Sequence, residues 1–133
     1  MTSNGLLLDT HAWIWLLNGD TTLKPSAIAQ INEQAQSGDL YIAGISTWEV
    51  GMLVTHKRLT LTKPCLDWVN DGLQLTGIQS LPLSPSIAVE SCQLPGDFHG
   101  GPADRIIVAT ARIHNLTLMT RDTKIIKYAK KDF

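Results

Sequence analysis

The chain has 133 residues, of which 44% are hydrophobic and 17% are charged. These values are typical of a folded globular protein, and they exclude a disordered or fibrous one. The formal net charge of -1 creates no general attraction for nucleic acid, so that any such contact must come from a local basic patch.

Predicted strands and helices alternate along the whole chain. The first strand, Gly5-Leu6-Leu7-Leu8, is a short apolar run without alternation, which is typical of a strand buried on both faces, and it stops at Asp9-Thr10. Proline at a first helical position and glycine or asparagine at an end set most helix bounds. We expect helices at 12–17, from Pro25 to Gly38, from Ser46, from Pro64 to Asp71-Gly72, from Pro85 to Leu94, from Pro102 to His114 and after Asp122-Thr123, with strands at 40–43, 76–83 and 116–120.

This alternation predicts one domain, residues 1–133, with a three-layer α/β/α fold and a central parallel sheet of four to five strands. In such a sheet the carboxyl ends of the strands share one edge, and ligands bind where the strand order reverses. If the second and fourth strands flank the first, Asp9, Glu49 and Asp122 emerge near that point. Asp104, in the first turn of a helix, reaches it only if that turn folds over the same edge.

Each of these four carboxylates also has a purely structural explanation. Asp9 and Asp122 are suited to capping helices, and Asp104 complements a helix dipole. Ser46 and Glu49 have the spacing of a capping box, which places Glu49 in the first turn of its helix.

When several carboxylates lie close together, however, their negative charges must be balanced. Two ionised carboxylates about 4 Å apart repel by about 4 kcal/mol at an effective dielectric constant near 20. Such a group therefore binds a cation or takes up protons. Mg²⁺ or Mn²⁺ with oxygen ligands resolves the repulsion, and an ion of this kind supports hydrolysis of a phosphodiester bond.

Four motifs follow one another along the chain: Leu6-Leu7-Leu8-Asp9-Thr10-His11, Ile45-Ser46-Thr47-Trp48-Glu49-Val50, Pro102-Ala103-Asp104-Arg105-Ile106-Ile107-Val108-Ala109-Thr110-Ala111 and Thr120-Arg121-Asp122. Their combination and order resemble the PIN domain, in particular the VapC-type toxins of bacterial toxin–antitoxin pairs. The resemblance implies an endoribonuclease that depends on Mg²⁺ or Mn²⁺, hydrolyses RNA phosphodiester bonds, forms a homodimer and is held inactive by a cognate antitoxin protein. It runs over almost the whole chain, including Leu83-Ser84-Pro85 and Leu94-Pro95.

The resemblance also implies roles for single residues. Asp9 and Asp104 match principal metal ligands, Glu49 matches a ligand or base, and Asp122 matches a second-metal or water-mediated ligand. Thr10, Thr120 and Ser46 are expected to support them. Apart from the resemblance, Lys124 and Lys127, with Lys130 on the same helical face, and Arg105 and Arg121 are candidates for contacts with RNA phosphates, although a lysine row is equally typical of a solvated face.

One departure from the family pattern keeps an alternative open. The family loop usually carries His-x-Asp-Pro, whereas this chain has His99-Gly100-Gly101-Pro102, with glycine at the position of the aspartate. A PIN scaffold that has lost catalysis and only binds a partner therefore remains an alternative. The chain also ends at Phe133, where relatives commonly add a further short strand.

Two other classes of protein fit less well. A phosphatase of the haloacid-dehalogenase kind uses a second aspartate two residues after the first, and His11 stands there. A phosphoacceptor receiver domain needs an acidic pair at the first strand and a lysine after a late strand, and neither pattern is present.

The sequence also gives expectations for the cellular compartment of the protein and for the positions of its tryptophans. Cys65 and Cys92 lack metal-ligand spacing and no leader segment is recognisable, which favours a reduced, cytoplasmic protein. No apolar run approaches the roughly 20 residues of a membrane span, so no membrane partner is expected. Trp13, Trp15 and Trp48 are expected to pack in the core or in an interface.

Overall fold

A computed structural model of the chain describes residues 5–75 and 77–129. Within these residues four parallel strands form one sheet in the order β3-β2-β1-β4, which confirms the predicted fold class and the flanking of the first strand by the second and the fourth. The strands are β1 (Leu6–Leu8), β2 (Leu40–Ala43), β3 (Gln79–Leu81) and β4 (Thr117–Met119). The helices are α1 (Thr10–Asn18), α2 (Pro25–Gln36), α3 (Gly44–Thr55), α4 (Cys65–Leu75), α5 (Pro85–Cys92), α6 (Pro102–His114) and α7 (Thr123–Ala129).

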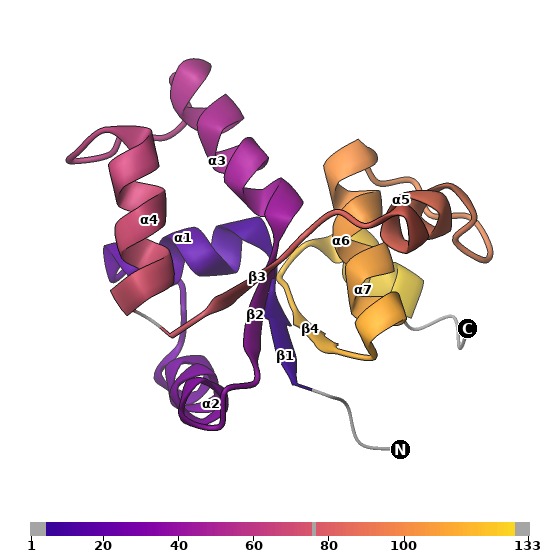
Figure 1. Cartoon of the computed structure of the whole chain (residues 1–133), viewed down its shortest axis with the longest axis horizontal. Coiled ribbons are helices and arrows are strands. Elements are labelled where there is room, and N and C mark those ends of the chain that lie inside the picture. Colours follow the sequence, from indigo (N-terminus) through magenta and orange to yellow (C-terminus); the bar gives the residue numbers. More distant parts are fainter. Residues whose placement is uncertain (1–4, 76, 130–133) are drawn as a thin grey trace.

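Helices cover both faces of the sheet, so β1 is buried along its whole length. Figure 1 shows α1, α2 and α4 gathered on one side of the strands and α5, α6 and α7 on the other. Leu6 and Leu8 pack in one core cluster with Trp13 of α1, whereas Leu7 packs with Ile107 of α6. This two-sided burial explains why β1 is apolar at every position. It also explains why the first polar residue of the run, Asp9, marks the end of the strand.

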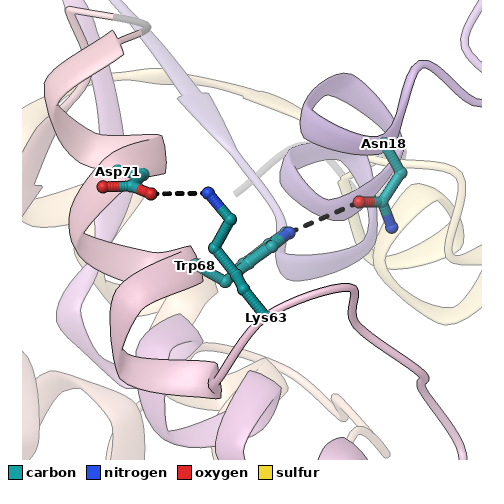
Figure 2. A network of polar contacts seen from close by, with 4 residues as sticks. All are labelled: Asn18, Lys63, Trp68 and Asp71. Carbon is teal, nitrogen blue, oxygen red and sulfur yellow. Dashed lines mark hydrogen bonds and ion pairs between the residues drawn. The ribbon is translucent and has the colours of Figure 1, made fainter.

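Helix α4 does not end at Asp71-Gly72 as expected from the sequence but continues to Leu75. A Cβ atom at Gly72 would lie 2.5 Å from Leu17 Cδ1. The glycine is therefore needed for the close approach of α1 to α4, and it does not end α4. The same contact region includes a hydrogen bond from the Trp68 indole N–H to Asn18 Oδ1 at 3.4 Å and an exposed ion pair of Lys63 with Asp71 at 2.6 Å (Figure 2).

Helix α3 also begins differently from the sequence prediction. It starts at Gly44, directly after β2, so Ser46 is not its N-cap and Glu49 does not lie in its first turn. The capping-box interpretation of Ser46 and Glu49 is therefore wrong. The third strand is shorter than expected, and Thr76 lies outside the described residues.

The tryptophans divide between the core and the surface. Trp13 is fully buried, with its ring 5.3 Å from that of Trp68, whereas the Trp48 side chain is 55% exposed. Across residues 5–75 and 77–129, no helix is long and apolar enough to cross a membrane.

Candidate active site

The four carboxylates named from the sequence line a single cavity of about 450 Å³. Asp9 enters it from the end of β1, Glu49 from α3, and Asp122 from the segment after β4. The first turn of α6 lies over the same sheet edge, and it brings Asp104 to this group. The other lining residues are Thr10, His11, Leu53, Arg58 and Ile107.

Asp9 is both a helix cap and a wall of the cavity. Its Oδ1 accepts a hydrogen bond from the backbone N–H of Ala12 at 2.8 Å, as expected for the N-cap of α1. Its Oδ2 accepts a hydrogen bond from the Thr120 hydroxyl at 2.5 Å. The Thr120 oxygen in turn accepts the backbone N–H of Asp122 at 3.0 Å, which couples the segment after β4 to the end of β1. These contacts orient the Asp9 carboxylate from both sides.

Glu49 is held by the Thr10 hydroxyl, which is in turn paired with that of Ser46, and no local sequence pattern indicated these contacts. The Thr10 hydroxyl donates to Glu49 Oε1 at 2.6 Å, and the Thr10 and Ser46 hydroxyl oxygens lie 2.8 Å apart in a second hydrogen bond. Thr10 and Ser46 are both buried, so water does not compete for these contacts. Ser46 therefore acts across the fold on Thr10 rather than at the start of its own helix.

Asp104 and Asp122 retain the local contacts expected of acids at helix starts. Asp104 Oδ2 accepts the backbone N–H of Gly101 at 3.3 Å, and Asp122 Oδ1 accepts the backbone N–H of Lys124 at 2.8 Å. The structural explanation is thus correct for Asp9, Asp104 and Asp122. It does not exclude a second role, because each carboxylate has further lone pairs and faces the common cavity.

The electrostatics of the cavity reflect burial and mutual repulsion. Burial raises the pKa of Glu49, and the charges of Asp104 and Asp9 add to this rise, against the hydrogen bond from Thr10 and the nearby His11. Burial also raises the pKa of Asp104, as do the charges of Asp122 and Asp9, while the Gly101 hydrogen bond and Lys124 oppose the rise. Both carboxyl groups therefore hold a proton to higher pH than they would in water.

The basic residues differ in their exposure and in their hydrogen bonds within the chain. Arg105 donates from Nε to the Ser91 carbonyl at 2.9 Å and from Nη1 to the Phe98 carbonyl at 2.8 Å, so it braces the loop before α6. Lys124 and Lys127 are exposed on α7, and Lys130 lies outside the described residues. Arg121 is exposed and donates to the Thr22 carbonyl at 3.3 Å.

Arg58 is a cavity residue that the sequence analysis missed. It follows α3, is exposed, and lines the acidic cavity together with Glu49 and Leu53. Its backbone N–H bonds to the Leu53 carbonyl at 2.8 Å, which folds the chain back toward the cavity. No spacing in the sequence pairs Arg58 with the acids, and only the folded chain shows that they line the same cavity.

Gly101, which stands where the resemblance implies an aspartate, leaves room for a side chain. Gly101 is the N-cap of α6, with an extended backbone at φ −69°. A Cβ atom there would meet only Asp104 Oδ2, at 3.9 Å, which is ordinary contact. Gly100 is different, because a Cβ atom there would overlap Phe98 Cζ and would lie 2.6 Å from Phe98 Cε2 and 3.0 Å from Asp104 Cβ.

The carboxylate set fits a hard divalent cation in chemistry. Within residues 5–75 and 77–129, however, no three His, Cys, Asp or Glu side chains are arranged to hold a metal ion by themselves. Mg²⁺ keeps several waters and is usually bound by one or two carboxylates together with substrate phosphates. An arrangement of separate carboxylates around one cavity therefore suits an ion whose coordination is completed by water and substrate.

A parallel sheet with carboxylates gathered where its strand order reverses defines a class of α/β protein with an acidic site at the sheet edge. The family profile described as the PIN domain matches residues 6–131, and the chain belongs to this family. It is 31% identical over 122 residues to Ribonuclease VapC22 of Mycobacterium tuberculosis, a match that covers 90% of this chain and 88% of that protein. A solved toxin–antitoxin complex from Klebsiella pneumoniae contains a chain with 26% identity and a TM-score of 0.61, covering 90% of this chain and 88% of that one.

Proposed function

We propose that this protein is a metal-dependent endoribonuclease and the toxin component of a toxin–antitoxin pair. The observation that carries the proposal is the convergence of Asp9, Glu49, Asp104 and Asp122 on one cavity. Membership of the PIN domain family and similarity to a VapC ribonuclease support the same chemistry. Family membership also displaces the phosphatase and receiver-domain alternatives.

In the proposed mechanism the four acids have two kinds of role, metal binding and proton transfer. When bound, Mg²⁺ or Mn²⁺ supplies an activated water and stabilises the charge that develops on the phosphoryl group. Asp9 and Asp104 would hold the ion as principal ligands and Asp122 would act as a second-metal or water-mediated ligand, with Thr120 orienting Asp9. Glu49, oriented by Thr10 at Oε1, would accept a proton from the attacking water at its other oxygen.

Positive charge at the cavity suits an RNA substrate. Arg58 lines the cavity, and Lys124 lies close enough to lower the pKa of Asp104 against its overall rise. With Arg121 and Lys127, these residues are proposed to contact RNA phosphates. Arg105 is proposed instead to support the loop before α6, since its Nε and Nη1 groups donate to the Ser91 and Phe98 carbonyls within the chain.

A partner protein follows from the same proposal. The neighbouring face of α3 leaves Trp48 55% exposed and Met52 36% exposed, and exposed apolar side chains beside a cavity suit a protein contact. The likeness to a chain of a toxin–antitoxin complex supports a cognate antitoxin as one partner. A homodimer in the absence of antitoxin is proposed as well, and light scattering of the purified chain tests it.

The deciding experiment is cleavage of a mixed cellular RNA pool with Mn²⁺, with Mg²⁺ and with a chelator. We expect cleavage by the wild-type protein with metal, none with chelator, and none by Asp104→Asn. Asp97→Asn is the matched control, because Asp97 is exposed in the loop before α6 and is not among the residues lining the cavity. Equal cleavage by Asp104→Asn and the control, or cleavage in chelator, contradicts the proposal.

The impaired-scaffold alternative has its own test. A correctly folded wild-type protein that cuts no RNA with either metal favours that alternative, since the glycine at position 101 is the one departure within the loop. Gly101→Asp then restores the family residue at a position with room for it. Cleavage gained by this variant identifies the glycine as the cause.

A further inference from the structure

A second cavity adjoins the acidic one at Asp9. It has a volume of about 250 Å³ and lies between α1, the start of α2 and the end of β4. Two of its lining residues, Ala12 and Thr120, are the residues that donate hydrogen bonds to the two Asp9 carboxylate oxygens. Hydrogen bonds at Asp9 therefore connect the linings of the two cavities, and a ligand in the second one lies near the proposed site of cleavage.

The floor of this second cavity is apolar and includes an aromatic ring. Trp15 is partly buried there, beside Leu23, Ala27 and Met119. A nucleobase presents flat, apolar faces that stack on aromatic side chains. A methionine thioether is polarisable and adapts its shape to a ring. The floor thus suits the face of a single base.

The rim of the cavity is cationic and rich in hydroxyl groups. Lys24 and Arg121 both line it and are exposed, and in the described part of the chain neither forms an ion pair. Thr22 and Ser26 lie at the same rim. Cationic side chains attract phosphates, and hydroxyl groups pair with the polar edge of a base. The whole chain has a net charge of -1, so the positive charge of Lys24 and Arg121 is confined to the rim of this cavity and is not a property of the whole surface.

We propose that this cavity holds one unstacked nucleobase of a single-stranded RNA, adjacent to the bond that is cut. Lys24 and Arg121 contact the phosphates on either side of that base. The inference rests on the proposed nuclease function and adds to it a determinant of sequence preference. Bases in a double helix are stacked and paired, so the cavity selects single strands.

The test fills the cavity at Ala27 and measures RNA binding without metal. The probe is a short fluorescein-labelled single-stranded RNA of random sequence, compared with the same RNA carrying abasic sites, in fluorescence anisotropy with chelator. Ala27→Leu places a larger side chain in the cavity, whereas Ala29→Leu, the matched control, makes the same change at an exposed position of the same helix. We expect Ala27→Leu to bind intact RNA about tenfold more weakly than wild type, from the loss of one stacked base.

Three further results are expected together with that loss. Ala29→Leu binds as the wild type does, and abasic RNA no longer distinguishes the wild type from Ala27→Leu. Lys24→Gln lowers the salt dependence of RNA binding by about one phosphate contact while preserving the difference between intact and abasic RNA. Thermal melts of each variant show that it is folded, and Lys24→Gln tests the cavity independently of any change at Ala27.

The failures of the two proposals are distinguishable, because this binding assay requires no cleavage. Equal affinity of the wild type and Ala27→Leu for intact RNA overturns the proposal that the cavity binds a base. Contact with a protein partner is then the better explanation of the cavity. Absence of RNA binding by the wild type overturns the proposed base site also. Base-dependent binding without cleavage under either metal counts against the nuclease proposal alone.

Discussion

Thr10→Val should destabilise the protein by removing one hydroxyl group at constant shape. That hydroxyl bonds to Glu49 Oε1 at 2.6 Å and to Ser46 Oγ at 2.8 Å. Thr10 is 2% exposed and Ser46 0%, so water does not reach the Ser46 hydroxyl in place of the lost Thr10 oxygen. A hydrogen bond to a charged group contributes about 1.5–3 kcal/mol. We therefore expect a loss of about 2 kcal/mol in the free energy of unfolding, equivalent to a fall in Tm of roughly 5–10 °C.

The same substitution has a defined pH dependence. The Thr10 hydrogen bond lowers the pKa of Glu49 against the stronger effect of burial, so its loss raises the folded-state pKa further. A raised carboxyl pKa means that stability falls as pH rises from the unfolded-state value through the folded-state value. The part of the loss that comes from ionisation is therefore absent at acid pH and reaches its full size above the folded-state pKa of Glu49.

Thr110→Val is the matched control for this measurement. Thr110 is also buried, at 1% exposed, but its hydroxyl donates to the Ile106 carbonyl of its own helix at 2.7 Å. Removing that local bond leaves no carboxylate without a partner, so we expect a loss below about 1 kcal/mol. The assay is chemical or thermal unfolding of both variants with chelator at several pH values. Equal losses for the two variants, or a Thr10→Val loss that does not grow with pH, refute the role assigned to the Thr10 hydroxyl.

Three further predictions concern the residues around the cavity. Asp104→Asn should raise the stability of the metal-free protein by about 0.5–2 kcal/mol, because it relieves repulsion at a functional site; the pKa of Asp104 is raised by burial and neighbouring acids, so melts should show this gain at neutral pH and its disappearance at acid pH. Gly100→Ala should lower the free energy of unfolding by about 1–3 kcal/mol, because its Cβ atom would overlap Phe98 Cζ and lie 2.6 Å from Phe98 Cε2, while Gly101→Ala should melt near the wild type. Identical melting temperatures for the two variants contradict this. Lys124→Gln should lower the salt slope of RNA binding by about one, and an unchanged slope removes it from the RNA contact.

The fold was predictable from local patterns where burial is two-sided and boundaries carry strong signals. The apolar run of β1, the proline that opens α2 and the Pro102 start of α6 all lie where expected. Local sequence patterns gave wrong predictions where the residue in question instead contacts a residue far away in the sequence. Gly72 predicts a helix end but instead makes room for Leu17, and Ser46 predicts a cap but instead bonds to Thr10.

The candidate site was predictable to a different extent for each residue. Asp9, Glu49 and Asp122 could be placed together because parallel strands present their carboxyl ends at one edge. Asp104 could be assigned to them only by resemblance, since its position depends on how the first turn of α6 packs. Arg58 was not predictable, because nothing near it in the sequence relates it to an acid.

By itself, the sequence determined the alternation of elements, the buried central strand and the acids at the strand ends, because these depend on periodicity and on contacts between near neighbours. Tertiary structure alone decided which side chains meet across long separations. The contact of Thr10 with Glu49 spans 39 residues and that of Thr120 with Asp9 spans 111. Local propensity carries no information about such pairs, since their partners are chosen by the packing of helices on the sheet.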